Sequence, residues 1–267
     1  MLELDGQSPF TFVEGSLPIL VSFPHNSSFI PQSLKRRFSE SGRSSQDTDW
    51  FLDRLYDLDE LKQASKIVAG FSRYVIDLNR PADNQSLYPG QTTTGLIPAS
   101  CFDGSEIYLE AVPKEDEIDE RIQHIWRPYH EKIESELDRL KHEFGYAVLI
   151  EAHSIKSRVP RLFEGTIPDF NVGTNNGLSC SPDLQDQIAG VLESQNDYSH
   201  VINGRFIGGY ITRHFGSPEH KIHAVQFELS QATYLDEEAA QWDDVNATKV
   251  QTVFSKIMQA ITQWQPN

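Results

Sequence analysis

Ser22-Phe23-Pro24-His25-Asn26 and Glu151-Ala152-His153-Ser154 each place a histidine just beyond a short apolar run, 17–23 in the first case and 146–150 in the second. Apolar runs this short, bounded by Gly and Pro, are typical of buried strands rather than helices. Open α/β sheets bind their ligands at the carboxyl ends of strands. We therefore expect both imidazoles near strand ends, at the edge of a sheet where a ligand binds.

Other segments extend this pattern to the whole chain. Apolar runs predict strands at 17–23, at 67–78, which is long enough for two pieces, at 146–152 and at 222–229. Helical spacing predicts helices at 49–63, capped by Asp47 or Thr48; at 114–144, which Pro128 should kink or split; and at 245–264. Strands that alternate with helices indicate an α/β fold with a mixed or largely parallel sheet covered on both faces. No repeat or low-complexity linker divides the 267 residues, so we treat 1–267 as a single domain.

The chain is strongly acidic, with a formal net charge of -16. Binding to nucleic acid or to an anionic membrane depends on Lys and Arg, so this charge argues against both partners. The start, Met-Leu-Glu-Leu-Asp, lacks the basic and apolar stretches of a signal peptide, and no run approaches the length of a membrane span. We expect a cytoplasmic protein in which Cys101 and Cys180 are free thiols.

Polar side chains stand at the ends of all four predicted strands. They are His25, Asn79-Arg80, His153 and Glu228. Each one alone has an ordinary structural explanation, but together they would converge on one edge of a mostly parallel sheet. The stretch 81–104, rich in Gly, Pro and Thr, is then expected to be a structured loop over this edge.

The two histidines indicate a metal site. Two imidazoles and one carboxylate form a known catalytic zinc set, which leaves a position for a water molecule. Spacing alone leaves the third ligand open among Asp49, Asp47 and Glu151. Asp49 also has an ordinary explanation as a first-turn helix acid. Glu151 shares a strand face with His153 and could instead be an outer partner of that imidazole.

Glu228 is a candidate general base, because it is an acid in the otherwise apolar strand 222–229 and burying it without a partner would cost several kcal/mol. Four arginines lie near the predicted strand ends: Arg73, Arg80, Arg161 and Arg213. A guanidinium can hold a carboxylate through two hydrogen bonds or stabilise a developing oxyanion. For any single arginine, an ordinary ion pair is the competing explanation.

Seven blocks of the sequence, in order over about residues 10 to 264, closely resemble N-formylglutamate amidohydrolases. The blocks are Ser22-Phe-Pro-His25-Asn26, Asp47-Thr-Asp49-Trp, Ser72-Arg-Tyr-Val-Ile-Asp-Leu-Asn79-Arg80-Pro-Ala-Asp, Glu151-Ala-His153-Ser-Ile, Pro160-Arg161-Leu-Phe-Glu-Gly, Gly208-Gly-Tyr-Ile-Thr-Arg213-His-Phe-Gly and Gln226-Phe-Glu228-Leu-Ser-Gln. That family is related to zinc carboxypeptidases and aspartoacylases. The resemblance implies a phosphorylase/hydrolase-like three-layer α/β/α sandwich with a central mixed sheet.

The resemblance also implies roles for single residues. His25, Asp49 and His153 would bind one divalent metal ion, with Zn²⁺ expected, and Glu228 would be the general base. Arg73 would point at the substrate carbonyl. The pair Asn79-Arg80 would hold one substrate carboxylate, and Arg161 and Arg213 are candidates for the second carboxylate.

The implied reaction is the metal-dependent hydrolysis of N-formyl-L-glutamate to formate and L-glutamate, a step of histidine degradation. One alternative is a deacylase or carboxypeptidase for another acidic N-acyl amino acid, which would use the same residues. Another is a non-catalytic amino-acid-binding protein, which would keep the arginines but would not need Glu228. The sequence does not predict the oligomeric state.

Overall fold

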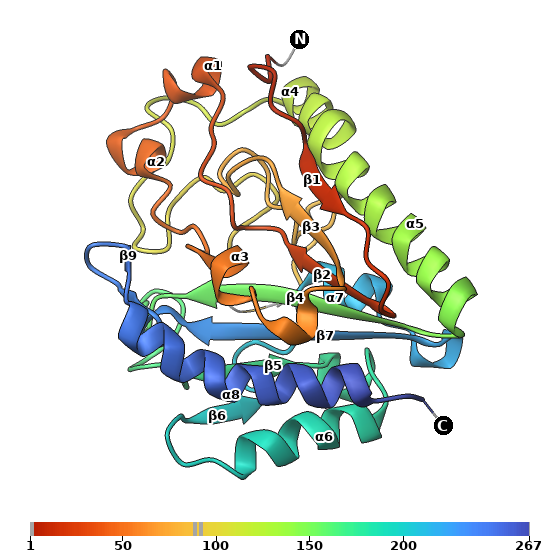
Figure 1. Cartoon of the computed structure of the whole chain (residues 1–267). Coiled ribbons are helices and arrows are strands. Elements are labelled where there is room, and N and C mark those ends of the chain that lie inside the picture. Colours follow the sequence, from red (N-terminus) through yellow and green to blue (C-terminus); the bar gives the residue numbers. More distant parts are fainter. Residues whose placement is uncertain (1–2, 88–89, 91–92, 267) are drawn as a thin grey trace.

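A mixed sheet is the centre of the molecule. The computed structural model describes residues 3–87, 90 and 93–266, and within them the sheet has seven strands in the order β1-β3-β2-β4-β7-β5-β6 (Figure 1). The strands are β1 (Phe10–Val13), β2 (Ile19–Phe23), β3 (Ser65–Ala69), β4 (Ala147–Ile155), β5 (Phe170–Gly173), β6 (His200–Ile202) and β7 (Ile222–Ser230). Strands β3, β2, β4 and β7 are parallel to one another, whereas β1 and β5 run antiparallel to their neighbours β3 and β7. A separate hairpin pairs β8 (Leu235–Asp236) with β9 (Gln241–Trp242).

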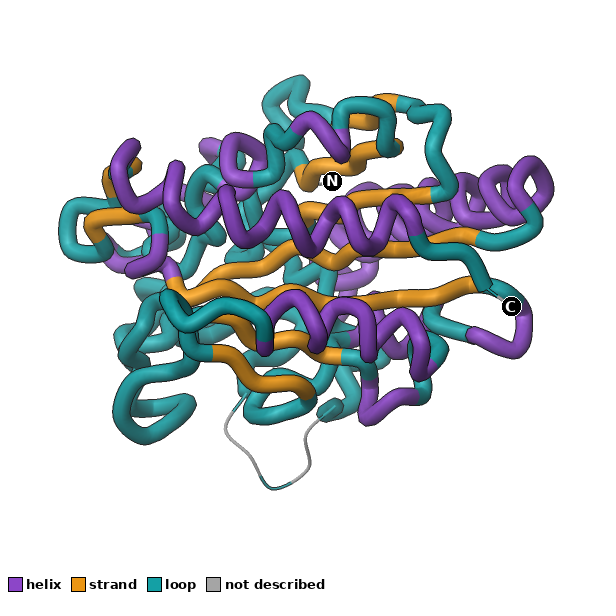
Figure 2. Tube along the Cα trace, turned by 60° about the horizontal axis from the view of Figure 1, so that its bottom comes forward, coloured by secondary structure: helices purple, strands orange, loops and turns teal. Residues whose placement is uncertain are grey.

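Helices cover both faces of this sheet (Figure 2). They are α1 (Gln32–Lys35), α2 (Glu40–Ser44), α3 (Leu52–Leu55), α4 (Glu115–Arg121), α5 (Arg127–Phe144), α6 (Pro182–Glu193), α7 (Tyr210–Phe215) and α8 (Asp244–Gln263). The predicted α/β fold with three layers is confirmed. No helix in the described ranges is long and apolar enough to span a membrane.

The strand predictions at 17–23, 146–152 and 222–229 are confirmed by β2, β4 and β7. The prediction at 67–78 is half right, because β3 ends at Ala69 and the chain then continues as buried irregular backbone. Cys101 and Cys180 are buried free thiols, as expected.

The helix predictions had mixed outcomes. The predicted helix 245–264 is confirmed by α8, whose N-cap Asp243 accepts hydrogen bonds from two backbone N–H groups. In 114–144 the disturbance expected at Pro128 is a π-helical turn, Ile122–Trp126, that joins α4 to α5 without a break. The predicted helix 49–63 is wrong: only α3 and a 3₁₀ turn form, because Phe51 has a φ of 57° in the left-handed region.

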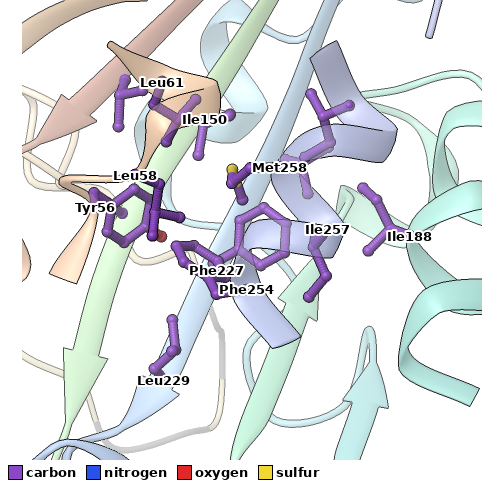
Figure 3. Close-up of a cluster of buried hydrophobic side chains, with 14 of the residues drawn as sticks. Tyr56, Leu58, Leu61, Ile150, Ile188, Phe227, Leu229, Phe254, Ile257 and Met258 are labelled. Atoms are coloured by element: carbon purple, nitrogen blue, oxygen red, sulfur yellow. The ribbon is translucent and has the colours of Figure 1, made fainter. Parts of the chain in front are cut away.

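The hydrophobic core lies on both faces of the sheet because strand side chains alternate between faces. On one face, Val148 and Ile150 of β4 share a cluster with Phe254 of α8. Figure 3 shows part of this cluster, with Phe227 of β7 beside Phe254. On the other face, Leu149 packs in a cluster with residues of α5. The residues of β4 two and four positions after Leu149 are Glu151 and His153, so they point toward the α5 and α7 side.

Candidate active site

The site lies where the parallel strands β2, β4 and β7 end. His25 follows β2 by two residues, whereas His153 and Glu228 are register partners two residues before the ends of β4 and β7. The ring centroids of His25 and His153 are 4.8 Å apart. Both imidazoles and Glu228 line one cavity. The expected convergence of these strand ends is confirmed.

Asp49 lies between the two histidines. Its Oδ2 is 3.0 Å from Nδ1 of His153 and 3.8 Å from Nδ1 of His25. One side-chain atom from each of the three residues lies within 4.8 Å of the other two, so the group His25, Asp49 and His153 could hold a metal ion. Asp49 is placed by its backbone N–H, which donates to the carbonyl of His25 at 3.0 Å. This contact replaces the helix start expected at Asp49.

Carboxylates bind the opposite nitrogen of each imidazole. Nε2 of His25 lies 2.7 Å from Oδ1 of Asp77, and Nε2 of His153 lies 2.8 Å from Oε1 of Glu151. The other oxygen of Glu151 accepts hydrogen bonds from the backbone N–H and the hydroxyl of Thr212 in α7. Such outer partners fix the orientation and tautomer of a metal-binding imidazole. Both histidines therefore present Nδ1 toward Asp49.

Glu151 and Asp47, the other two candidates for the third metal ligand, make different contacts. Glu151 is the outer partner of His153, as the shared strand face suggested. Asp47 does not belong to the group that could hold a metal ion, and its carboxylate accepts a hydrogen bond from the backbone N–H of Phe102 at 2.8 Å.

The titration properties of the two imidazoles fit metal ligands. Burial, together with Arg73, lowers the pKa of His25, so this imidazole is neutral. Its Nδ1 is buried and has no hydrogen-bond partner among the described residues. Burial opposes charge on His153 too, but Glu151 and Asp49 raise its pKa to about 10. In the absence of a cation, a proton on His153 thus balances the surrounding carboxylates, and a metal ion at Nδ1 would take over that function.

Glu228 points into the cavity and is only 7% exposed. Burial raises its pKa to about 8, and Asp49 and Glu151 act in the same direction. Its Oε2 accepts a long hydrogen bond from Nε2 of Gln226, at 3.4 Å. Among the described residues, the carboxyl group of Glu228 therefore has only a long hydrogen bond to Gln226, and it lines the cavity, where it can exchange a proton with a bound molecule.

Arg73 also lines the cavity, with its guanidinium over the ring of Phe102. Its Nη2 donates to Oδ2 of Asp77 at 2.7 Å, and Nη1 is 4.0 Å from Oδ1 of Asp49. Burial disfavours the charged form, but the carboxylates of Asp77, Asp49 and Asp47 outweigh it and raise the pKa of Arg73. Asp77 thus connects Arg73 to His25. Asp77 was not predicted as a site residue, although it is an acid within an apolar run, the same signal that identified Glu228.

Asn79 and Arg80 line the same cavity. The Asn79 amide contacts Nε2 of His153 at 3.0 Å, and its Oδ1 accepts the N–H of Ile211 in α7 at 3.0 Å. The guanidinium of Arg80 donates to the carbonyls of Thr94 and Asn79 and to the hydroxyl of Thr94. Thr93 and Thr94 also line the cavity, which agrees with a loop over the site, although residues 88–89 and 91–92 of that loop lie outside the described part.

The other two predicted arginines are elsewhere. Arg161 is exposed, donates to the carbonyl of Cys101 at 2.7 Å and does not line the cavity. Arg213 donates to the carbonyls of Gly208 and Leu87 and is also outside the lining. Arg205, which the sequence analysis did not select, does line it. No periodic pattern marks the loop that carries Arg205, so its place in the cavity could not be predicted from the sequence.

Known proteins resemble this chain along nearly all of its length. A family model for N-formylglutamate amidohydrolase matches residues 17–235. A curated N-formylglutamate deformylase from Pseudomonas putida is 46% identical over 256 residues, which is 95% of this chain and 96% of that protein. One from Pseudomonas aeruginosa is 46% identical over 258 residues, again 95% of this chain and 96% of the relative. The crystal structure of an N-formylglutamate amidohydrolase from Ralstonia eutropha JMP134 has the same fold, with a TM-score of 0.81 at 23% identity over 96% of this chain and 97% of that one.

Proposed function

Because the chain belongs to the N-formylglutamate amidohydrolase family, we propose that it hydrolyses N-formyl-L-glutamate to formate and L-glutamate. The single observation that carries the mechanism is the group His25, Asp49 and His153 beside Glu228 in one cavity. A small-molecule substrate of this kind needs a hydrolytic centre and a means of holding two carboxylates. The cavity offers side chains for both tasks.

The donor atoms suit a divalent cation, and we propose Zn²⁺. Two imidazole nitrogens and one carboxylate oxygen form a common catalytic zinc set. The orphaned Nδ1 of His25 and the outer carboxylates Asp77 and Glu151 support this choice. A metal ion bound there would act as a Lewis acid toward the formyl carbonyl and would lower the pKa of water.

Glu228 is proposed as the general base. Its carboxylate takes a proton from the attacking water and then donates it to the leaving nitrogen of glutamate, so that nitrogen departs as an amine. The register pairing with His153 supports this role, because it holds the carboxylate beside the proposed metal ligands. A cation nearby would oppose the raised pKa of Glu228 and favour the carboxylate form that a base requires.

Arg73 is proposed to stabilise the negative charge that develops on the formyl oxygen. Its raised pKa keeps the guanidinium charged at any physiological pH, and Asp77 fixes its direction. The same carboxylate orients His25, so one buried residue positions a ligand and an oxyanion-stabilising group together.

We propose different roles for the neighbouring residues Asn79 and Arg80. Asn79 positions His153 and the start of α7 through its amide, and Arg80 binds one substrate carboxylate. The sequence predicts Arg161 and Arg213 as partners of the second carboxylate, but neither lines the cavity, so they have no part in this proposal. A cytoplasmic location and a single domain also stay predictions.

Formate release from purified protein tests the function. We expect release from N-formyl-L-glutamate, loss of release after chelation, and recovery on adding Zn²⁺, with elemental analysis giving one metal ion per chain. N-formyl-L-aspartate and N-acetyl-L-glutamate in the same assay separate this activity from that of a related deacylase. A protein that binds glutamate without releasing formate would be the non-catalytic alternative.

A further inference from the structure

We propose that Arg205 binds the second substrate carboxylate, the one that Arg80 does not hold. This inference rests on the proposed function and names a residue that determines its specificity. Arg205 lines the cavity that contains His153, Glu228 and Arg80.

The charges in the cavity indicate that a second arginine, besides Arg80, binds the substrate. Asp49 and Glu228 are carboxylates of the site itself, and Arg73 is committed to Asp77 by a 2.7 Å ion pair. The substrate carries two negative charges into a protein whose formal net charge is -16. Arg80 alone cannot form bidentate contacts with two separate carboxylates, so a second guanidinium on the same cavity is the group that the chemistry requires.

The backbone around Arg205 is held tightly, as a binding residue requires. A Cβ on Gly173 would lie 2.6 Å from the nitrogen of Gly208, so the end of β5 packs directly on the loop that follows Arg205. The N–H of Gly209 donates to Oε1 of Gln226 at 2.6 Å, which ties the end of this loop to β7. The guanidinium itself is oriented by a 3.1 Å hydrogen bond from Nε to the carbonyl of Leu162. A group ordered in advance loses less entropy when it binds a ligand.

The cavity wall near Arg205 is apolar and suits the methylene groups that separate the two carboxylates of the substrate. Leu162, Phe206 and Phe102 line the cavity and pack on a small apolar cluster formed by Ile155 and its neighbours. The two methylene groups of a glutamate side chain would contact such a wall. Two guanidiniums and apolar side chains on the wall of one cavity therefore fit a short dicarboxylate.

Substrates that lack one carboxylate test this assignment. N-formyl-L-glutamine has no charge on the side chain, and 4-formamidobutanoate has no α-carboxylate. We expect Arg205→Gln to lower kcat/KM for N-formyl-L-glutamate about 100-fold, chiefly through KM, as befits a lost charge-assisted pair. With one of the two analogues the same variant should differ from the parent protein by less than about 3-fold, because that analogue lacks the carboxylate that Arg205 binds.

Arg158→Gln is the matched control, because Arg158 is an exposed arginine whose guanidinium bonds Thr166 outside this cavity. It measures the effect of removing one positive charge near the site. Arg205→Lys should recover part of the loss, since it restores charge without the bidentate geometry. Equal losses on all three substrates, or a larger loss for Arg161→Gln than for Arg205→Gln, would overturn the assignment.

A binding measurement separates this proposal from the proposed function. If the parent protein released no formate, the function would fail, but calorimetry with glutarate and butyrate would still test Arg205. We expect the parent to prefer the dianion glutarate and Arg205→Gln to lose that preference, while circular dichroism and metal content stay unchanged. A variant that keeps the preference for glutarate would refute the role of Arg205.

Discussion

Metal binding to this protein should release protons from His153 and Glu228, and the number released can be worked out from their surroundings. Nδ1 of His153 is 3.0 Å from Asp49, and its pKa is raised to about 10, so at pH 7.5 the metal-free imidazole carries a proton where a metal would bind. Glu228, with a pKa of about 8, is then roughly three-quarters protonated. Adding Zn²⁺ to metal-free protein should therefore release at least one proton from His153 and up to about 0.8 more from Glu228.

Calorimetry at pH 7.5 in two buffers with different ionisation enthalpies measures this number directly. Replacing Glu228 by Gln should reduce the release to about one proton, while Glu164→Gln, at an exposed glutamate, should leave it unchanged. Because each released proton competes with the metal, the apparent metal affinity should rise with pH. The rise should be about tenfold per pH unit between about pH 8 and 10, where His153 alone loses a proton, and steeper below about pH 8, where Glu228 loses one as well. Release near zero, or equal release from the Glu228→Gln variant, would refute this account of the site.

Three further outcomes are expected. Glu228→Gln should lower kcat by about 10²–10⁴-fold with metal content intact, and a variant of normal activity would contradict its role as base. Gly209→Ala should lower kcat/KM, because its Cβ would lie 2.2 Å from the amide of Asn79, whereas Gly190→Ala, which has open space, should be neutral in the same assay; equal effects would argue against this packing. His130 is buried with its pKa lowered to about 3, so below pH 6.5 the unfolded chain takes up a proton that the folded chain does not. The free energy of unfolding, measured with urea, should therefore fall by about 2 kcal/mol more between pH 7.5 and 5 in the parent protein than in His130→Gln, and an identical pH dependence in both proteins would contradict this account.

The parts of the fold that could be predicted are those in which burial and local conformation agree. The runs that became β2, β4 and β7 are buried along nearly their whole length, so their apolar composition identified them. The edge strand β1 and the short strand β6 have only 4 and 3 residues and are partly exposed, which left no such signal. In 49–63 the leucines are buried as their spacing predicted, but hydrogen bonds from this segment to the His25 loop prevent a continuous helix.

The site shows the same division. His25, His153 and Glu228 could be predicted because each interrupts or follows an apolar strand. Asp77 and Arg205 belong to irregular segments, whose course depends on tertiary contacts that no local pattern encodes. The cavity lining also separated Arg80 from Arg161 and Arg213, which sequence composition could not do.

The nine-residue register between β4 and β7 sets the spacing of His153 and Glu228 through backbone hydrogen bonds alone. Arg80 and Arg205, in contrast, are carried by connecting segments outside the sheet. Replacing those segments by the corresponding segments of a homologue with a different substrate preference should therefore change which N-acyl amino acid is accepted. The residues on the sheet that carry out hydrolysis would stay in place. Evolution could diversify this enzyme by loop replacement without rebuilding its centre.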